Sequence, residues 1–147
     1  MSPKCAAIIT PPTDTTSQLL DQGFSLADQG RLDEALSLCQ QILRTNDLSP
    51  RAYFLRGLIQ GQQGQSLLAA EDFQRVILLD IKMVMAHYHL AHVYRQIGRK
   101  SEALRSLQTT VRLLTKMKAD ESIPDAKDWT VTGLLERCGA DLKQLEK

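Results

Sequence analysis

The chain has 147 residues, of which 43% are hydrophobic and 24% are charged, and its formal net charge is +1. This composition is typical of one soluble globular domain. A nearly neutral chain has no overall field that would favour nucleic acid, an acidic substrate or a membrane surface. No apolar run approaches the roughly 18 residues of a membrane-spanning helix, and three widely separated cysteines argue against a disulfide framework. We therefore expect a cytoplasmic domain with no membrane insertion and no nucleic-acid partner.

The first 15 residues differ in character from the rest of the chain. They contain three prolines (Pro3, Pro11 and Pro12), three threonines and one serine, and their apolar residues show no helical period. Such a composition is typical of a flexible arm or linker, and we assign residues 1–15 to one.

Residues 16–117 carry a pattern of small residues that recurs every 34 positions. Each unit has a small residue at its position eight, glycine at position fifteen and alanine at position twenty. These residues are Gly23, Gly57 and Ala91, then Gly30, Gly64 and Gly98, then Ala35, Ala69 and Ala103. The units are 16–49, 50–83 and 84–117.

Each unit reads as two helices joined at its glycine, where a left-handed backbone conformation costs least. The small residue at position eight lets the partner helix approach closely, and apolar residues continue at helical spacing in the second helix. The helices are predicted at 16–29, 33–46, 50–63, 66–79, 84–97 and 100–117.

Beyond the repeated units, residues 118–128 are polar and contain Pro124, which predicts a loop. Thr130 or Thr132 can cap one more helix within 129–147, whose apolar residues fall on one face. Stacked repeats leave a bare apolar face at their end, and this helix is predicted to cap it, with Trp129 filling the corner between loop and helix.

A period of 34 residues with this arrangement of small residues resembles the tetratricopeptide repeat (TPR), a helix–turn–helix unit. The predicted fold is therefore all-α, with three TPR units in a right-handed superhelix and a C-terminal capping helix. Two positions depart from the pattern, since position seven, normally leucine, is Gln22 in the first unit and Arg56 in the second. We expect these two units to be looser or tilted.

The resemblance also implies where a partner would bind. In TPR superhelices the first helices line a concave wall, with positions two, five, nine, twelve and thirteen facing it. The candidate groove residues are Leu20, Phe24, Arg51, Phe54, Leu58, Met85, Tyr88, His92 and Arg95. An apolar and aromatic floor with arginines at its edges suits a protein or peptide segment with apolar anchors and an acid or two. The N-terminal arm or the last helix could instead cover this surface within the molecule.

The sequence offers little for catalysis. His89 and His92 are three residues apart and could share a metal on one helix face, but no third ligand is suggested nearby. Cys39 occupies a core position with no recurring cation beside it, whereas a reactive thiol needs a stabilised thiolate. We expect no catalytic residue, no cofactor and no metal, and we interpret the chain as a protein-interaction module.

A narrower resemblance covers residues 70–145. The run from Phe73 to Asp80, the segment Ser101–Leu107 and the stretch beginning at Trp129 resemble the TPR extension of chemotaxis receptor methyltransferases of the CheR type. That resemblance implies the regulatory or docking part of a methylation system, with a receptor, a methyltransferase domain or another signalling protein as partner. The alternative is a free-standing chaperone or adaptor, like the three-repeat chaperones of type III secretion.

Overall fold

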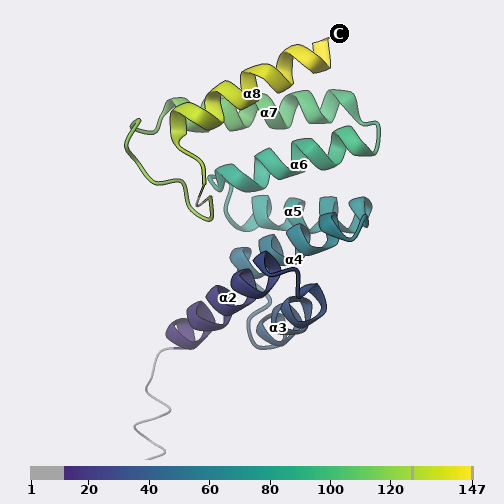
Figure 1. Cartoon of the computed structure of the whole chain (residues 1–147), viewed down its shortest axis with the longest axis vertical. Coiled ribbons are helices and arrows are strands. Elements are labelled where there is room, and N and C mark those ends of the chain that lie inside the picture. Colours follow the sequence, from purple (N-terminus) through teal and green to yellow (C-terminus); the bar gives the residue numbers. More distant parts are fainter. Residues whose placement is uncertain (1–11, 127, 147) are drawn as a thin grey trace, which may run out of the picture.

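The computed structural model of the protein describes residues 12–126 and 128–146, and this part of the chain is helical without any strand. The helices are α2 (Pro12–Asp28), α3 (Leu32–Thr45), α4 (Pro50–Gln62), α5 (Ser66–Leu79), α6 (Val84–Gln96), α7 (Lys100–Thr115) and α8 (Val131–Glu146). Figure 1 shows them stacked in chain order, from α2 and α3 at one end to α8 at the other. The predicted all-α superhelical fold is confirmed.

Five of the six repeat helices begin and end within about two residues of their predicted bounds. The first one differs, because α2 begins at Pro12 and so includes residues that we assigned to the arm. Proline is well tolerated in the first turn of a helix, where its missing N–H has no intrahelical partner. The rest of the predicted arm, residues 1–11, lies outside the described residues.

The glycines at position fifteen end the first helix of each unit as predicted. Gly30, Gly64 and Gly98 have φ values of +79°, +79° and +82°, a conformation that glycine adopts most easily. After Gly30 the chain turns back at once, since the amide of Arg31 donates to the carbonyl of Leu26 at 2.9 Å. The turn thereby satisfies a carbonyl that the end of α2 would leave unpaired.

The small residues at position eight mark close contacts between helices. A Cβ atom built on Gly57 would lie 2.8 Å from Cε1 of Phe73, and one on Gly23 would lie 2.7 Å from Cδ2 of Leu55. Phe73 is therefore able to lie directly on the backbone of α4, where it also contacts Phe54 with 5.8 Å between ring centroids. These fully buried rings belong to the largest core cluster, which continues through α6 and α7.

The alanines at position twenty are equally confined. Ala103 is fully buried in α7, so Ala103→Leu would force extra methyl groups into a filled core. We expect this variant to lower the free energy of unfolding by roughly 1–2 kcal/mol. Ala140→Leu, at an exposed position of α8, is the matched control and should change it little. Urea denaturation of both variants measures the difference, and equal stabilities would show that α6 and α7 are loosely packed.

Position seven of the second unit holds an ion pair where a leucine is usual. Arg56 donates to both carboxylate oxygens of Asp72, with Nε–Oδ2 at 2.7 Å and Nη2–Oδ1 at 2.8 Å. Arg75 adds a third contact to Asp72 at 2.8 Å. Because Asp72 is only 1% exposed, this ion pair joins α4 and α5 from inside the structure. The sequence showed that Arg56 departs from the repeat pattern, but it did not reveal this buried partner.

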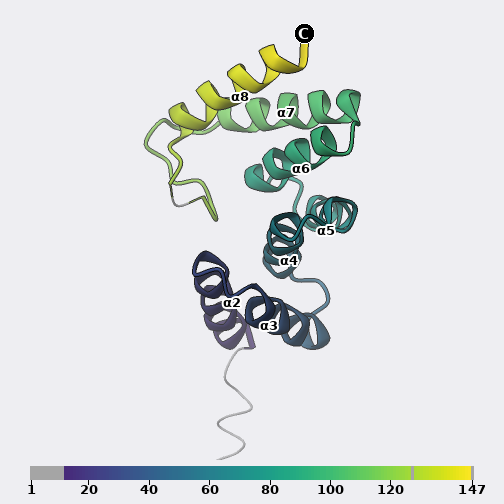
Figure 2. The ribbon, with the colours of Figure 1, turned by 45° about the vertical axis from the view of Figure 1, so that its right-hand side comes forward.

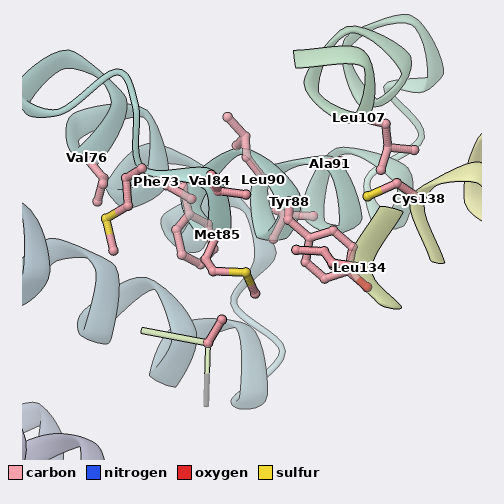
Figure 3. Packing of buried hydrophobic residues seen from close by; sticks show 14 of the residues in the cluster. Phe73, Val76, Val84, Met85, Tyr88, Leu90, Ala91, Leu107, Leu134 and Cys138 are labelled. Atoms are coloured by element: carbon pink, nitrogen blue, oxygen red, sulfur yellow. The ribbon is translucent and has the colours of Figure 1, made fainter. Parts of the chain in front are cut away.

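The last helix caps the stack as predicted. Thr130 accepts a hydrogen bond from the amide of Gly133 at 2.9 Å, so it is the residue that caps α8. Figure 3 shows Tyr88 of α6 beside Leu134 of α8, and Cys138 of α8 near Leu107 of α7. Leu134 and Cys138 are fully buried, and α8 covers the apolar face that the third unit would otherwise expose.

The segment between α7 and α8 does not run directly from one helix to the other. Figure 2 shows it turning back along the stack, toward the level of α2 and α4. We call residues 118–126 and 128–130 the return loop. None of the described helices combines the length and the hydropathy that crossing a bilayer requires.

Candidate functional site: a cavity on the concave side

A cavity of about 370 Å³ opens between α2, α4, α6 and the return loop. Its large apolar side chains come one from each of these four elements, namely Phe24, Leu58, Met85 and Trp129. Its remaining lining residues are Asp21, Asp28, Arg51, His89, Asp125, Ala126 and Asp128. We call this space the concave cavity. Three helices of the stack hold its walls, so the cavity is largely preformed.

An ion pair fixes the return loop to the stack. Arg51 of α4 donates to both carboxylate oxygens of Asp125, at 3.1 Å and 3.0 Å, and lies 3.5 Å from Asp21 of α2. Hydrogen bonding to Asp125 raises the pKa of Arg51, so the arginine stays charged. Asp125 has a positive φ of +58°, which is uncommon for a residue with a side chain. The bidentate contact with Arg51 helps hold this strained turn in place.

His89 contributes a neutral ring to the cavity. It lies between two phenylalanines, with ring centroids 5.7 Å from Phe54 and 5.8 Å from Phe73. Burial among these rings, with a smaller contribution from His92, lowers the pKa of His89 to about 4. At neutral pH the charge of the cavity lining is therefore set by its aspartates and Arg51 alone.

The structure brings together four of the nine predicted groove residues in this cavity: Phe24, Arg51, Leu58 and Met85. Leu20 and Phe54 do not line it, because they are buried between helices at 3% and 0% exposure. Leu20 packs with Ile42 and Ala52 in a small cluster between α2, α3 and α4. These two positions serve the core rather than an open surface.

The other three predicted residues face the last helix. His92 Nε2 lies 3.7 Å from the Asp141 carboxylate of α8, and Arg95 donates to Gln144 at 2.7 Å. Tyr88 is 6% exposed. The last helix thus contacts this part of the predicted groove, although His92 and Arg95 keep 34% and 40% of their side-chain surface exposed. Contact with the last helix is one of the two intramolecular alternatives raised by the sequence.

The histidine pair shows no arrangement suited to a metal. His89 faces Phe54 and Phe73, while His92 faces Asp141, and the described residues include no group of three side chains that could hold a metal ion. His87 is buried and its Nε2 lies 2.8 Å from the carbonyl of Ile81, in keeping with its predicted packing position. Cys39 is also buried, and desolvation raises its pKa to about 12, so its thiol is not activated.

The sequence reasoning missed the acidic residues of the cavity and the part played by the return loop. Asp28 occupies position thirteen of the first unit, a position expected to face the concave side, so the repeat pattern contained that signal. The return loop carried no comparable signal, because nothing in its sequence shows that Asp125 meets Arg51, 74 residues earlier. That pairing also bears on the expected preference for a partner's acid, because Arg51, one of the two arginines at the groove edges, is already bound to an aspartate.

Comparison with solved structures finds proteins of the same overall architecture. The type III secretion translocator chaperone SycD of Yersinia enterocolitica is 22% identical, with 99% of this chain and 93% of that chain covered and a TM-score of 0.80. PcrH from Pseudomonas aeruginosa is also 22% identical, with 91% and 93% covered and a TM-score of 0.76. An O-GlcNAc transferase mutant of Thermobaculum terrenum is 22% identical over 92% of this chain but only 23% of that chain, with a TM-score of 0.72. At such identities the likeness concerns the fold.

Sequence comparison gives the family. A search of curated protein sequences found no match. Two models of the tetratricopeptide repeat match residues 20–83 and 86–120, which together make up more than half of the chain. The protein therefore belongs to the tetratricopeptide repeat family.

Proposed function

We propose that this protein is a non-catalytic chaperone that binds a segment of another protein in the concave cavity. The observation that carries the proposal is the cavity itself, whose apolar side chains Phe24, Leu58 and Met85 are held on three packed helices. Preformed concave surfaces with apolar anchors are typical of peptide recognition. Binding there would cover these side chains and would order little of the protein, which keeps the entropic cost of association low.

The client that we propose is a secreted translocator protein of a type III secretion system. SycD has been solved in complex with a peptide of the translocator YopD, and PcrH in complex with the chaperone binding region of PopD. The likeness to SycD extends over nearly the whole of both chains, so it includes the last helix and the return loop as well as the repeats. This supports a free-standing chaperone more than a docking extension of an enzyme.

The methyltransferase association expected from the sequence is not supported by the comparisons, in which type III secretion chaperones are prominent. It stays a second hypothesis because it makes a different prediction about the partner. A chaperone would hold a secreted protein, whereas a docking module would hold a receptor or a methyltransferase domain. Identifying the partner therefore separates the two.

The experiment begins with the tagged full chain expressed in its native cell, purification, and identification of the proteins that remain bound. The identified partner is then produced separately, and its affinity is measured by calorimetry for the wild type, for Leu58→Glu and for Leu68→Glu. Leu58 lines the cavity, whereas Leu68 is 46% exposed on α5 and lies outside the cavity. We expect Leu58→Glu to weaken binding at least tenfold, because a charge would be buried against the client's apolar side chain. Leu68→Glu should leave the affinity unchanged.

Thermal melting of both variants checks that they are folded. A secreted client whose affinity is the same for Leu58→Glu and the wild type would show that the cavity is not the binding site. A methyltransferase or receptor as the bound partner would overturn the chaperone proposal in favour of a docking module.

A further inference from the structure

We propose that the client segment carries a lysine or arginine next to its apolar anchor, and that this cation pairs with Asp28 and Asp128 at the mouth of the concave cavity. The inference rests on the proposed function and adds the chemistry of the segment that the cavity selects. It reverses the charge preference that the sequence suggested.

The charges that line the cavity favour a cation. Among the described residues, four aspartates and one arginine line it, and these five have a formal charge of −3. Arg51 is already held by Asp125 and also lies 3.5 Å from Asp21. Within the described part of the cavity lining, Asp28 and Asp128 therefore pair with no cation. The neutral ring of His89 adds none.

The position of Asp28 strengthens this conclusion. Asp28 is the last residue of α2, and the last turn of that helix contains no basic residue. The carbonyl groups at a helix C-terminus carry partial negative charge, so a carboxylate there is unfavourable for the helix. Folding thus gains nothing from this charge, while the helix end and the carboxylate together create a negative potential that attracts a cation.

An aromatic surface suited to a long basic side chain lines the same cavity as these carboxylates. Trp129 follows Asp128 directly, lines the cavity and is 36% exposed. A lysine or arginine can lay its methylene groups along such a ring and place its charged end on a neighbouring carboxylate. The cavity already contains one arrangement of this kind, because the guanidinium of Arg51 lies 5.3 Å from the centroid of the Phe24 ring.

The test uses a phage-displayed library of random dodecapeptides, selected on the folded full chain. In parallel, the library is selected on Asp28→Lys/Asp128→Lys and on Leu58→Glu. For the wild type we expect enrichment of lysine or arginine adjacent to an apolar residue. For the charge-reversed variant we expect enrichment of aspartate or glutamate at the same place, and for Leu58→Glu we expect these peptides to be lost.

One enriched peptide is then synthesised with its basic residue and with glutamine in its place. We expect Asp28→Asn/Asp128→Asn to raise the dissociation constant of the basic peptide roughly fivefold at low salt, as two partly exposed ion pairs are lost. The glutamine peptide should bind the variant and the wild type alike. Asp33→Asn/Glu71→Gln is the matched control, because it removes two exposed acids outside the cavity and should have no effect on either peptide.

The outcomes separate this inference from the proposed function. Some outcomes overturn the charge preference and leave the cavity as the binding site. One is that the peptides depend on Leu58 but show no enriched basic residue. The other is that Asp28→Lys/Asp128→Lys does not select acidic residues in place of basic ones. Basic peptides that bind Leu58→Glu equally well attach elsewhere and also overturn it. If no peptide depends on Leu58, the proposed function fails and the charge preference fails with it.

Discussion

Arg56→Met is expected to lower the free energy of unfolding by about 3–4 kcal/mol. The substitution leaves the carboxylate of Asp72 only 1% exposed and takes away its two hydrogen bonds from Arg56. Removing one partner of a buried pair costs several kcal/mol because the remaining charge is buried without compensation. Arg75 keeps one contact with Asp72, so we place the loss of stability at the lower end of the roughly 3–5 kcal/mol that breaking a buried ion pair costs.

Two further variants show whether the buried charge is the cause. Arg56→Met/Asp72→Leu removes both charges and restores an apolar position seven, so it should recover most of the lost stability. Arg75→Met removes a side chain that is 48% exposed and should cost at most about 1 kcal/mol. Urea denaturation measures all four proteins. A double variant no more stable than Arg56→Met would show that packing of the arginine, not its charge, accounts for the loss.

Acidification from pH 7 to pH 5 is expected to remove about 2 kcal/mol of stability through His89 alone. Burial lowers the pKa of His89 from 6.5 to about 4, so the unfolded chain takes up a proton at a higher pH than the folded one. Stability is therefore complete above pH 6.5 and falls as the pH decreases toward 4. Burial also lowers the pKa values of His87 and His92, and they add to the loss in the same direction.

His89→Phe isolates this contribution. The added ring keeps an aromatic side chain between Phe54 and Phe73 but cannot be protonated, so the variant should lose about 2 kcal/mol less than the wild type between the two pH values. Urea denaturation at pH 7 and pH 5 gives the comparison. Parallel losses in the two proteins would mean that His89 takes up its proton as readily in the folded state as in the unfolded one.

The repeat period allowed most of the fold to be predicted. Because the same small residues recur every 34 positions, one assignment of helix and turn applied to three units at once. The positive φ values of Gly30, Gly64 and Gly98 bear it out. The start of α2 at Pro12 was missed because proline suggested a break, although it fits equally well at the first position of a helix.

The candidate site was predicted less well, for a different physical reason. Repeat positions indicate which side of a helix faces inward, but they do not indicate what lies opposite. Tyr88, His92 and Arg95 were placed on the correct helix, yet Tyr88 is buried there and the other two interact with α8. Leu20 and Phe54 were assigned to a surface, whereas close packing of neighbouring helices buries them. Contacts such as Arg51 with Asp125 join segments far apart in the chain and have no periodic signature.

The return loop has a consequence for synthesis on the ribosome. Helices emerge in chain order, so Phe24, Leu58 and Met85 leave the ribosome well before Trp129, which forms the fourth side of the concave cavity. Roughly forty residues separate Met85 from Trp129, and translation adds about 5–20 residues per second. For about 2–8 seconds the nascent chain therefore exposes three apolar side chains that the finished protein partly encloses. During that interval a nascent chain offers these residues to any neighbouring polypeptide, without the acidic mouth that Asp128 completes.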